Sequence, residues 1–276
     1  MPERLAGGRR LAWREAGAGA PALLLHCALA HSGAWAGVMA RLGDRLAMRA
    51  PDLPGHGRTD PAPEGRSVQD QALADARALL PPVDPEGPAP RRVHLIGHSF
   101  GGTVALRLAI EAPDRVASLS LYEPVLFALL AVADPAAFAA ETAAAKPERA
   151  RMAAGDWTGA AEAFLGRWGA PGGLAALPEA SRAAMVAGMP FVRRSEADIA
   201  EPATARPRPE DLGRITAPTL LMAGADSPPV VAAIGVALAA RIPGARRIVL
   251  PGLGHMGPIT HPDAVADALR AVLPGP

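Results

Sequence analysis

Short runs of apolar residues alternate with amphipathic stretches along most of the chain. The apolar runs have the length of buried strands, and the stretches between them have helical spacing. The predicted strands cover 22–26, 45–50, 93–96, 118–122, 219–223 and 246–250. The predicted helices cover 33–41, 67–80, 103–112, 229–241 and 262–273. Because parallel strands need helical crossovers, the alternation predicts an α/β fold with a mostly parallel central sheet flanked by helices. A looser run over 11–16 predicts an additional antiparallel edge strand.

The alternation is interrupted between residues 125 and 210, where the pattern predicts helices and no strand. Asp156 is a candidate N-cap for a helix whose apolar positions share one face. Those positions are Trp157, Ala160, Ala161, Phe164, Leu165 and Trp168. A second helix is expected from Pro178 and carries Met185, Val186 and Met189. We therefore expect residues 1–124 and 211–276 to form an α/β core, and residues 125–210 to form a helical cap over the strand ends, where such sheets bind ligands.

Composition excludes several classes of protein. The chain has 276 residues, 50% of them hydrophobic, and its 28 basic and 27 acidic residues leave a net charge of +1. Its arginine pairs are scattered, so no nucleic-acid partner is expected. Cys27 is the only cysteine, which excludes an internal disulfide and a cysteine-based zinc site.

The first residues do not resemble a signal peptide, and the apolar run over 125–133 is too short to cross a membrane. We expect a cytoplasmic protein without a membrane partner; the sequence does not specify its oligomeric state. Residues 81–90 read as a proline-rich surface loop.

A candidate nucleophile lies in the segment Gly97-His98-Ser99-Phe100-Gly101, between a predicted strand and a predicted helix. A serine on so tight a bend needs residues without a Cβ atom two positions before it and two positions after it, and Gly97 and Gly101 occupy these positions. The bend exposes the Ser99 hydroxyl at a helix N-terminus, where N–H groups favour developing negative charge. This context favours nucleophilic acyl chemistry over a chance cluster of glycines.

A serine hydroxyl needs a base, and the base needs an orienting acid. His255 follows the strand 246–250, and Asp226 follows the strand 219–223, so both are expected at the same sheet edge as Ser99. We assign His255 as the base and Asp226 as the acid. Glu123, which ends the strand 118–122, is the competing acid; alternatively it caps that strand or neutralises an arginine. The backbone amides of Phe100 and Ala28 are the expected oxyanion donors.

The other histidines have structural interpretations. His94 lies within a strand and His261 begins the last helix, whereas His26 and His56 lie in turns where backbone hydrogen bonds are expected. His98 should point away from the reacting face. His31 has no spacing that identifies it as a base.

These features together resemble the α/β-hydrolase superfamily, in its capped, esterase-like branch. The resemblance rests on the His26 loop, the segment 52–59 (Asp-Leu-Pro-Gly-His-Gly-Arg-Thr), the Ser99 bend, Asp226 and the His255 loop. It implies hydrolysis through an acyl-enzyme, with no metal and no organic cofactor. The family usually has glycine where this chain has Cys27, so the oxyanion loop is expected to be narrowed or shifted. Cys27 itself is interpreted as a small packing residue rather than a second nucleophile.

The expected substrate is a small to medium hydrophobic carboxylic ester. Candidate pocket walls are Trp35, Trp157, Phe164, Trp168, Met185 and Met189. The same residues also fit simple packing within the cap. Hydrolysis of a carbon–carbon bond is an alternative that requires a cationic residue for a substrate carboxylate. Arg193 or Arg194 is a candidate for this role, although the pair is expected at the solvated surface. A lactonase or amidase is equally compatible, and a non-catalytic receptor ranks below these because serine, acid and histidine are all present.

Overall fold

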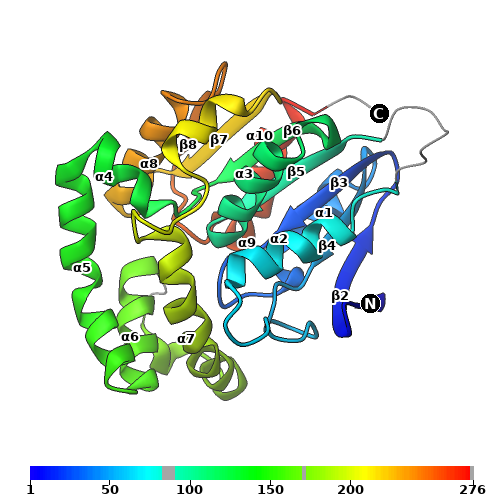
Figure 1. The fold of residues 1–276 in the computed structure, drawn as a ribbon. Coiled ribbons are helices and arrows are strands. Elements are labelled where there is room, and N and C mark those ends of the chain that lie inside the picture. Colours follow the sequence, from blue (N-terminus) through cyan, green and yellow to red (C-terminus); the bar gives the residue numbers. More distant parts are fainter. Residues whose placement is uncertain (83–90, 170–171, 274–276) are drawn as a thin grey trace.

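The computed structural model describes residues 1–82, 91–169 and 172–273. These residues form one sheet of eight strands in the order β1-β2-β4-β3-β5-β6-β7-β8 (Figure 1). The strands are β1 (Glu3–Ala6), β2 (Arg9–Ala16), β3 (Ala20–Leu25), β4 (Leu46–Pro51), β5 (Val93–His98), β6 (Val116–Tyr122), β7 (Thr219–Gly224) and β8 (Arg246–Leu250). From β4 to β8 every neighbouring pair is parallel, which confirms the predicted fold class.

The antiparallel part of the sheet lies at its beginning. Strand β2 pairs antiparallel with β4, as the run over 11–16 predicts. The outer strand β1 also pairs antiparallel with β2 and was not predicted. Its four residues are mostly exposed, so they have no apolar alternation to mark them. Most of the predicted loop at 81–90 lies outside the described residues.

Helices cover both faces of the sheet. The helices are α1 (Ala36–Leu42), α2 (Val68–Ala78), α3 (Phe100–Glu111), α4 (Leu130–Ala133), α5 (Pro135–Ala153), α6 (Trp157–Trp168), α7 (Glu179–Ile199), α8 (Pro229–Ala239), α9 (Gly257–Thr260) and α10 (Pro262–Arg270). Buried residues of α2, α3 and α8 form the core on one face. Those of α1 and α10 form the core on the other. Parallel strands buried on both faces explain why the apolar runs are nearly continuous.

The segment between β6 and β7 is helical, as predicted, and α4 to α7 gather beside the sheet (Figure 1). Asp156 caps α6, and its Oδ1 accepts a hydrogen bond from the Gly159 amide at 2.9 Å. The buried side of α6 includes Ala160, Leu165 and Trp168, as its spacing indicates. Helix α5 was not delimited from the sequence, because its run of alanines interspersed with charged residues gives no apolar stripe. No described helix is both long and apolar enough to cross a membrane.

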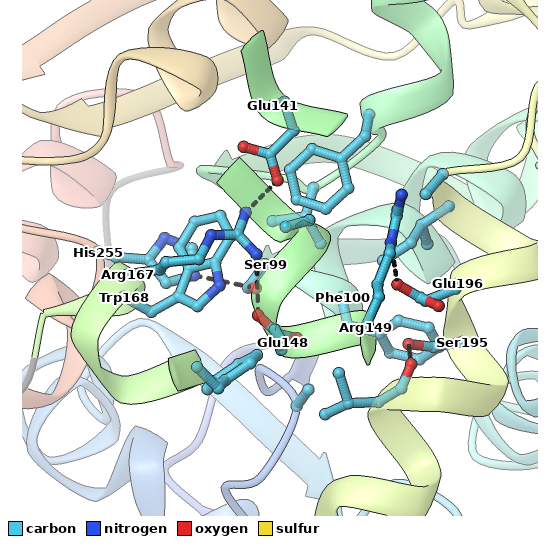
Figure 2. Close-up of a pocket in the computed structure, with 18 residues that line it drawn as sticks. Ser99, Phe100, Glu141, Glu148, Arg149, Arg167, Trp168, Ser195, Glu196 and His255 are labelled. Atoms are coloured by element: carbon cyan, nitrogen blue, oxygen red, sulfur yellow. Dashed lines mark hydrogen bonds and ion pairs between the residues drawn. The ribbon is translucent and has the colours of Figure 1, made fainter. Parts of the chain in front are cut away.

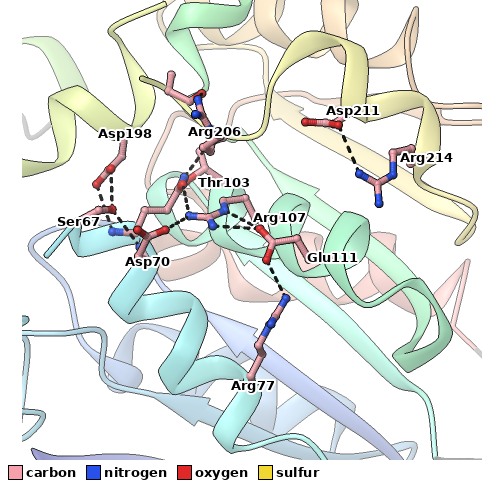
Figure 3. A network of polar contacts seen from close by, with 12 residues as sticks. Ser67, Asp70, Arg77, Thr103, Arg107, Glu111, Asp198, Arg206, Asp211 and Arg214 are labelled. Atoms are coloured by element: carbon pink, nitrogen blue, oxygen red, sulfur yellow. Dashed lines mark hydrogen bonds and ion pairs between the residues drawn. The ribbon is translucent and has the colours of Figure 1, made fainter. Parts of the chain in front are cut away.

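A polar network joins the C-terminal end of α7 to α2 and α3 (Figure 3). Asp198 accepts hydrogen bonds from the Ser67 hydroxyl at 2.7 Å and from the Gln69 amide at 3.2 Å. The Gln69 side chain donates to Thr103 Oγ1 at 2.9 Å and to the Arg206 carbonyl at 3.0 Å. Burial raises the pKa of Asp198, although these hydrogen bonds oppose the shift. The network therefore fixes one end of the helical segment to the α/β core.

Replacing Asp198 with alanine should destabilise the fold, because it leaves a half-buried hydroxyl and a buried amide without their acceptor. We expect a loss of about 1–3 kcal/mol in the free energy of unfolding, measured by urea denaturation. Asp211→Ala is the matched control, because Asp211 pairs with the exposed Arg214 at 3.4 Å and such pairs contribute less than about 1 kcal/mol. Equal losses in the two variants would show that the network does not anchor α7.

Candidate active site

Ser99 stands at the bend between β5 and α3. Its backbone has φ 55° and ψ −121°, a conformation that strains any residue with a side chain. A Cβ on Gly101 would overlap the carbonyl oxygens of Leu25 and His26, and one on Gly97 would lie 2.7 Å from the Cα of Gly102. Glycine is therefore required on both sides of the serine, which is the physical basis of the sequence pattern.

His255 lies between Ser99 and a carboxylate. Its Nε2 is 3.0 Å from the Ser99 hydroxyl oxygen, and its Nδ1 is 2.6 Å from Oε2 of Glu123. The carbonyl of His255 accepts a hydrogen bond from Nε2 of His98 at 2.8 Å, so His98 turns away from Ser99 and supports the His255 loop. All three members of the chain are buried, with 6% of Ser99, 6% of His255 and 1% of Glu123 exposed. An imidazole bonded to a carboxylate at one nitrogen is fixed to accept a proton at the other.

Glu123 replaces Asp226 as the acid that contacts His255, so the expected pairing with Asp226 is corrected. Asp226 is exposed and forms no hydrogen bond with His255. The other oxygen of Glu123 accepts hydrogen bonds from the Gly224 amide at 2.6 Å and the Ser227 hydroxyl at 2.5 Å. Strands β6 and β7 are neighbours, so both acids lie at one sheet edge, but Glu123 lies deeper. Its φ of 46° turns the chain at the end of β6.

The loop after β3 is held by two histidines. His56 Nε2 accepts a hydrogen bond from the Leu29 amide at 3.0 Å, and His26 Nε2 accepts one from the Leu53 amide at 2.9 Å. Their Nδ1 atoms lie 3.1 Å from the Pro54 carbonyl and 2.7 Å from the Cys27 carbonyl, respectively. These bonds match the backbone role expected for both rings. Since the Leu29 amide is already bound, it is not available as an oxyanion donor.

The two expected oxyanion donors lie at the same cavity as the serine. Ala28, Ser99 and Phe100 all line it. Phe100 is the first residue of α3, so its amide has no acceptor within the helix. Cys27 is buried away from this cavity, and burial raises the pKa of its thiol to about 12. Because the thiolate is the nucleophilic form, Cys27 is unsuited to act as a second nucleophile near neutral pH.

The cavity beside Ser99 has a volume of about 60 Å³ and lies between the α/β core and α5, α6 and α7. Its walls are only partly apolar. Figure 2 shows Arg167 bound to Glu141 and to Glu148, the latter at 2.8 Å. Arg149 and Glu196 form a second ion pair at 2.5 Å. Burial raises the pKa of Glu148, although Arg167 opposes this shift. These ion pairs were missed in the sequence, because Glu and Arg on a helix usually face water.

Of the six predicted pocket residues, Phe164 and Trp168 line the cavity. The Trp168 and His255 ring centroids are 4.7 Å apart. The other four do not line it, which corrects the prediction. Trp35 is buried under the sheet beside α1. Trp157, Met185 and Met189 pack among α5, α6 and α7.

Arg193 and Arg194, the candidates for binding a substrate carboxylate in the alternative reaction, lie outside the cavity, as the expectation of a solvated arginine pair has it. Arg193 and Arg194 are exposed, and Arg194 donates to the carbonyls of Pro63 and Arg66. The cavity instead has Arg149 and Arg167, each paired with glutamate. Within the described ranges, no group of three or more His, Cys, Asp or Glu side chains is arranged to hold a metal ion.

Comparison with known proteins identifies the family. A family model described as "Alpha/beta hydrolase family" matches residues 22–268. The pimeloyl-[acyl-carrier protein] methyl ester esterase of Nitrosomonas europaea is 37% identical over 106 residues, which are 38% of this chain and 37% of that protein. The 2-hydroxymuconate semialdehyde hydrolase of Pseudomonas sp. (strain CF600) is 33% identical over 122 residues, which are 43% of this chain and 41% of that protein. The match spans about a third of the length of the first curated relatives.

Solved structures share the whole fold. The enol-lactonase from Burkholderia xenovorans LB400 superposes with a TM-score of 0.70 and 22% identity, covering 98% of each chain. Likeness at this level of identity reports on the fold and not on the substrate. The order of strands and helices therefore agrees with the family that the sequence motifs resemble.

The two buried histidines, His26 and His56, make the free energy of unfolding depend on pH. Burial lowers the pKa of His26 to about 3 and that of His56 to about 4. Between pH 6.5 and these values the unfolded chain binds protons that the folded chain does not, so stability decreases as the pH falls. His56→Gln should reduce this slope by up to about 1.4 kcal/mol per pH unit between pH 6 and 4.5.

The slope is measured by urea denaturation at several pH values in that window. The exposed His261→Gln is the matched control, and the relevant quantity is the difference between the slopes of the two variants. An unchanged slope in His56→Gln would mean that this ring is already charged in the folded protein.

Proposed function

Since the chain belongs to the α/β-hydrolase family, we propose that it hydrolyses a small to medium hydrophobic carboxylic ester through an acyl-enzyme on Ser99. One observation carries the proposal: a continuous chain of hydrogen bonds runs from Glu123 through His255 to the Ser99 hydroxyl. Polar groups aligned in this way activate a serine that is otherwise a weak nucleophile. The esterase among the relatives supports the same chemistry.

The reaction follows from the roles of these groups. His255 Nε2 takes the Ser99 proton as the Ser99 oxygen bonds to the ester carbonyl carbon. The carbonyl oxygen becomes an oxyanion that accepts hydrogen bonds from the Phe100 and Ala28 amides. The tetrahedral intermediate collapses, the ester C–O bond breaks, and His255 returns the proton to the leaving alcohol. Water then attacks the acyl-enzyme with His255 again as base, which releases the carboxylic acid and restores Ser99. Glu123 stabilises the imidazolium in each half-reaction.

We also propose that residues 125–210 act as a cap and that this cap sets the substrate class. Helices α5, α6 and α7 contribute most of the cavity wall, which supports this role. A cavity of about 60 Å³ is far smaller than the roughly 300–1,000 Å³ of pockets for drug-sized ligands, so it favours a short acyl group.

Carbon–carbon bond hydrolysis of an anionic substrate ranks second. The relative that acts on 2-hydroxymuconate semialdehyde favours it. The charges in the cavity disfavour binding of an anionic substrate, because both arginines of the cavity are already paired with glutamates. A substrate carboxylate would have to displace one of these partners.

The direct test is turnover of 4-nitrophenyl acetate and 4-nitrophenyl butyrate. We expect wild-type hydrolysis that disappears in Ser99→Ala, and labelling of Ser99 by a fluorophosphonate probe. A receptor that keeps the fold without catalysis would give no serine-dependent turnover. Absence of turnover and of labelling would refute the proposed activity.

Replacing each candidate acid in turn by its neutral amide tests the role of Glu123. Glu123→Gln should lower kcat at least about 100-fold, because the neutral amide no longer stabilises the imidazolium and can hold the wrong tautomer. Asp226→Asn is the matched control, and its kcat should stay within a factor of about 3, the ordinary spread of context effects at a site outside the hydrogen-bonded chain. A large loss in Asp226→Asn with little change in Glu123→Gln would reverse the assignment.

A further inference from the structure

Two larger clefts adjoin the cavity beside Ser99, and the three spaces share one wall. The first cleft, of about 460 Å³, lies between α5 and α8. The second, of about 510 Å³, lies over the His255 loop and includes Asp226. Arg167 and Trp168 line both clefts and also the inner cavity of about 60 Å³. These two residues, hereafter the partition, form the wall that the three spaces share.

Trp168 is held in the partition by other rings. Only 7% of it is exposed, and its centroid lies 4.7 Å from that of His255 and 6.0 Å from that of Phe127. It is the last residue of α6, and Gly169 then adopts a left-handed conformation with φ 90°. The side chain therefore lies where the helix ends, beside the His255 imidazole (Figure 2).

Arg167 is held by charge. Glu141 and Glu148 bind it from α5, and its guanidinium carbon lies 5.3 Å from the centre of the Trp168 ring. The cation thus lies against the aromatic ring and reinforces its position. Glu148 is itself only 4% exposed, so this contact is screened from water. The partition is built from a ring and a cation that immobilise each other.

We propose that Arg167 and Trp168 determine the size of the substrate by closing the inner cavity toward the α5–α8 cleft. In the closed arrangement only a short acyl group fits beside Ser99. When Trp168 is displaced or removed, the cavity joins the cleft, and a longer apolar acyl chain lies along it. The cleft wall suits such a chain, because it includes Ala137, Pro229, Val230 and Ala233. This inference deepens the proposed function and rests on Ser99-dependent ester hydrolysis.

The test compares 4-nitrophenyl octanoate with 4-nitrophenyl acetate. In Trp168→Ala the ratio of kcat/KM for octanoate to that for acetate should rise at least about tenfold over the wild type, because several methylene groups gain an apolar contact. Trp157→Ala is the matched control: it removes the same side chain from the same helix, but Trp157 lines none of the three spaces. Its ratio should remain that of the wild type.

A second pair of variants keeps the inference testable if Trp168→Ala fails to fold. Glu141→Gln weakens the ion pair that holds Arg167 and should raise the same ratio, whereas Glu162→Gln on α6 keeps its hydrogen bond with the Leu174 amide and should not. Wild-type protein without Ser99-dependent acetate turnover would refute the proposed function. Normal acetate turnover with an unchanged octanoate ratio in the folded Trp168→Ala and Glu141→Gln variants would refute the partition alone.

Discussion

The hydrogen bond between Glu123 and His255 is the interaction on which the rest of the site depends. A carboxylate that is 1% exposed is costly to bury unless its oxygens are bonded, and Gly224, Ser227 and His255 together supply donors. Two of these donors belong to the β7 end, and the third belongs to the loop after β8. Glu123 therefore joins three consecutive strand ends, and the histidine is positioned as a consequence.

The Ser99 bend is the complementary constraint. Helix α3 approaches β3 so closely at Gly101 that no side chain fits between them. This approach fixes the serine oxygen relative to the sheet, while Glu123 fixes the imidazole relative to the same sheet. The distance between the Ser99 oxygen and the His255 ring then follows from strand pairing between β5 and β6 and between β6 and β7. The helical segment contributes no residue to this hydrogen-bonded chain, but it contributes most of the wall of the cavity beside Ser99.

Local chemistry explains which parts of the site were predictable from the sequence. Ser99 was identified because a strand, a glycine-flanked bend and a helix occur together within about twenty residues, and each part has a signature of its own. His255 was predicted as the base from its position after a strand. The carboxylate that contacts His255 was not predicted, because Asp226 and Glu123 both follow strands at one sheet edge. Only burial and the turn at Glu123 distinguish them, and neither is visible in a pattern of residues.

Tertiary contacts also decide which residues line the cavity beside Ser99. Helical spacing identified the face of α6, but it does not say whether an aromatic ring on that face meets a cavity or another helix. Trp168 meets the cavity and Trp157 packs between helices. The buried ion pairs of Arg167 were missed because their partners lie on a different helix, α5, whose position relative to α6 is a property of the tertiary structure.

The most direct test of the proposed catalytic arrangement is a crystal structure of the protein after reaction with a serine-directed alkyl phosphonate. We expect phosphorus bonded to Ser99, the phosphoryl oxygen within hydrogen-bonding distance of the Phe100 and Ala28 amides, and His255 Nδ1 still bonded to Glu123. A phosphonate attached to another residue, or a His255 ring turned toward Asp226 in the adduct, would contradict it.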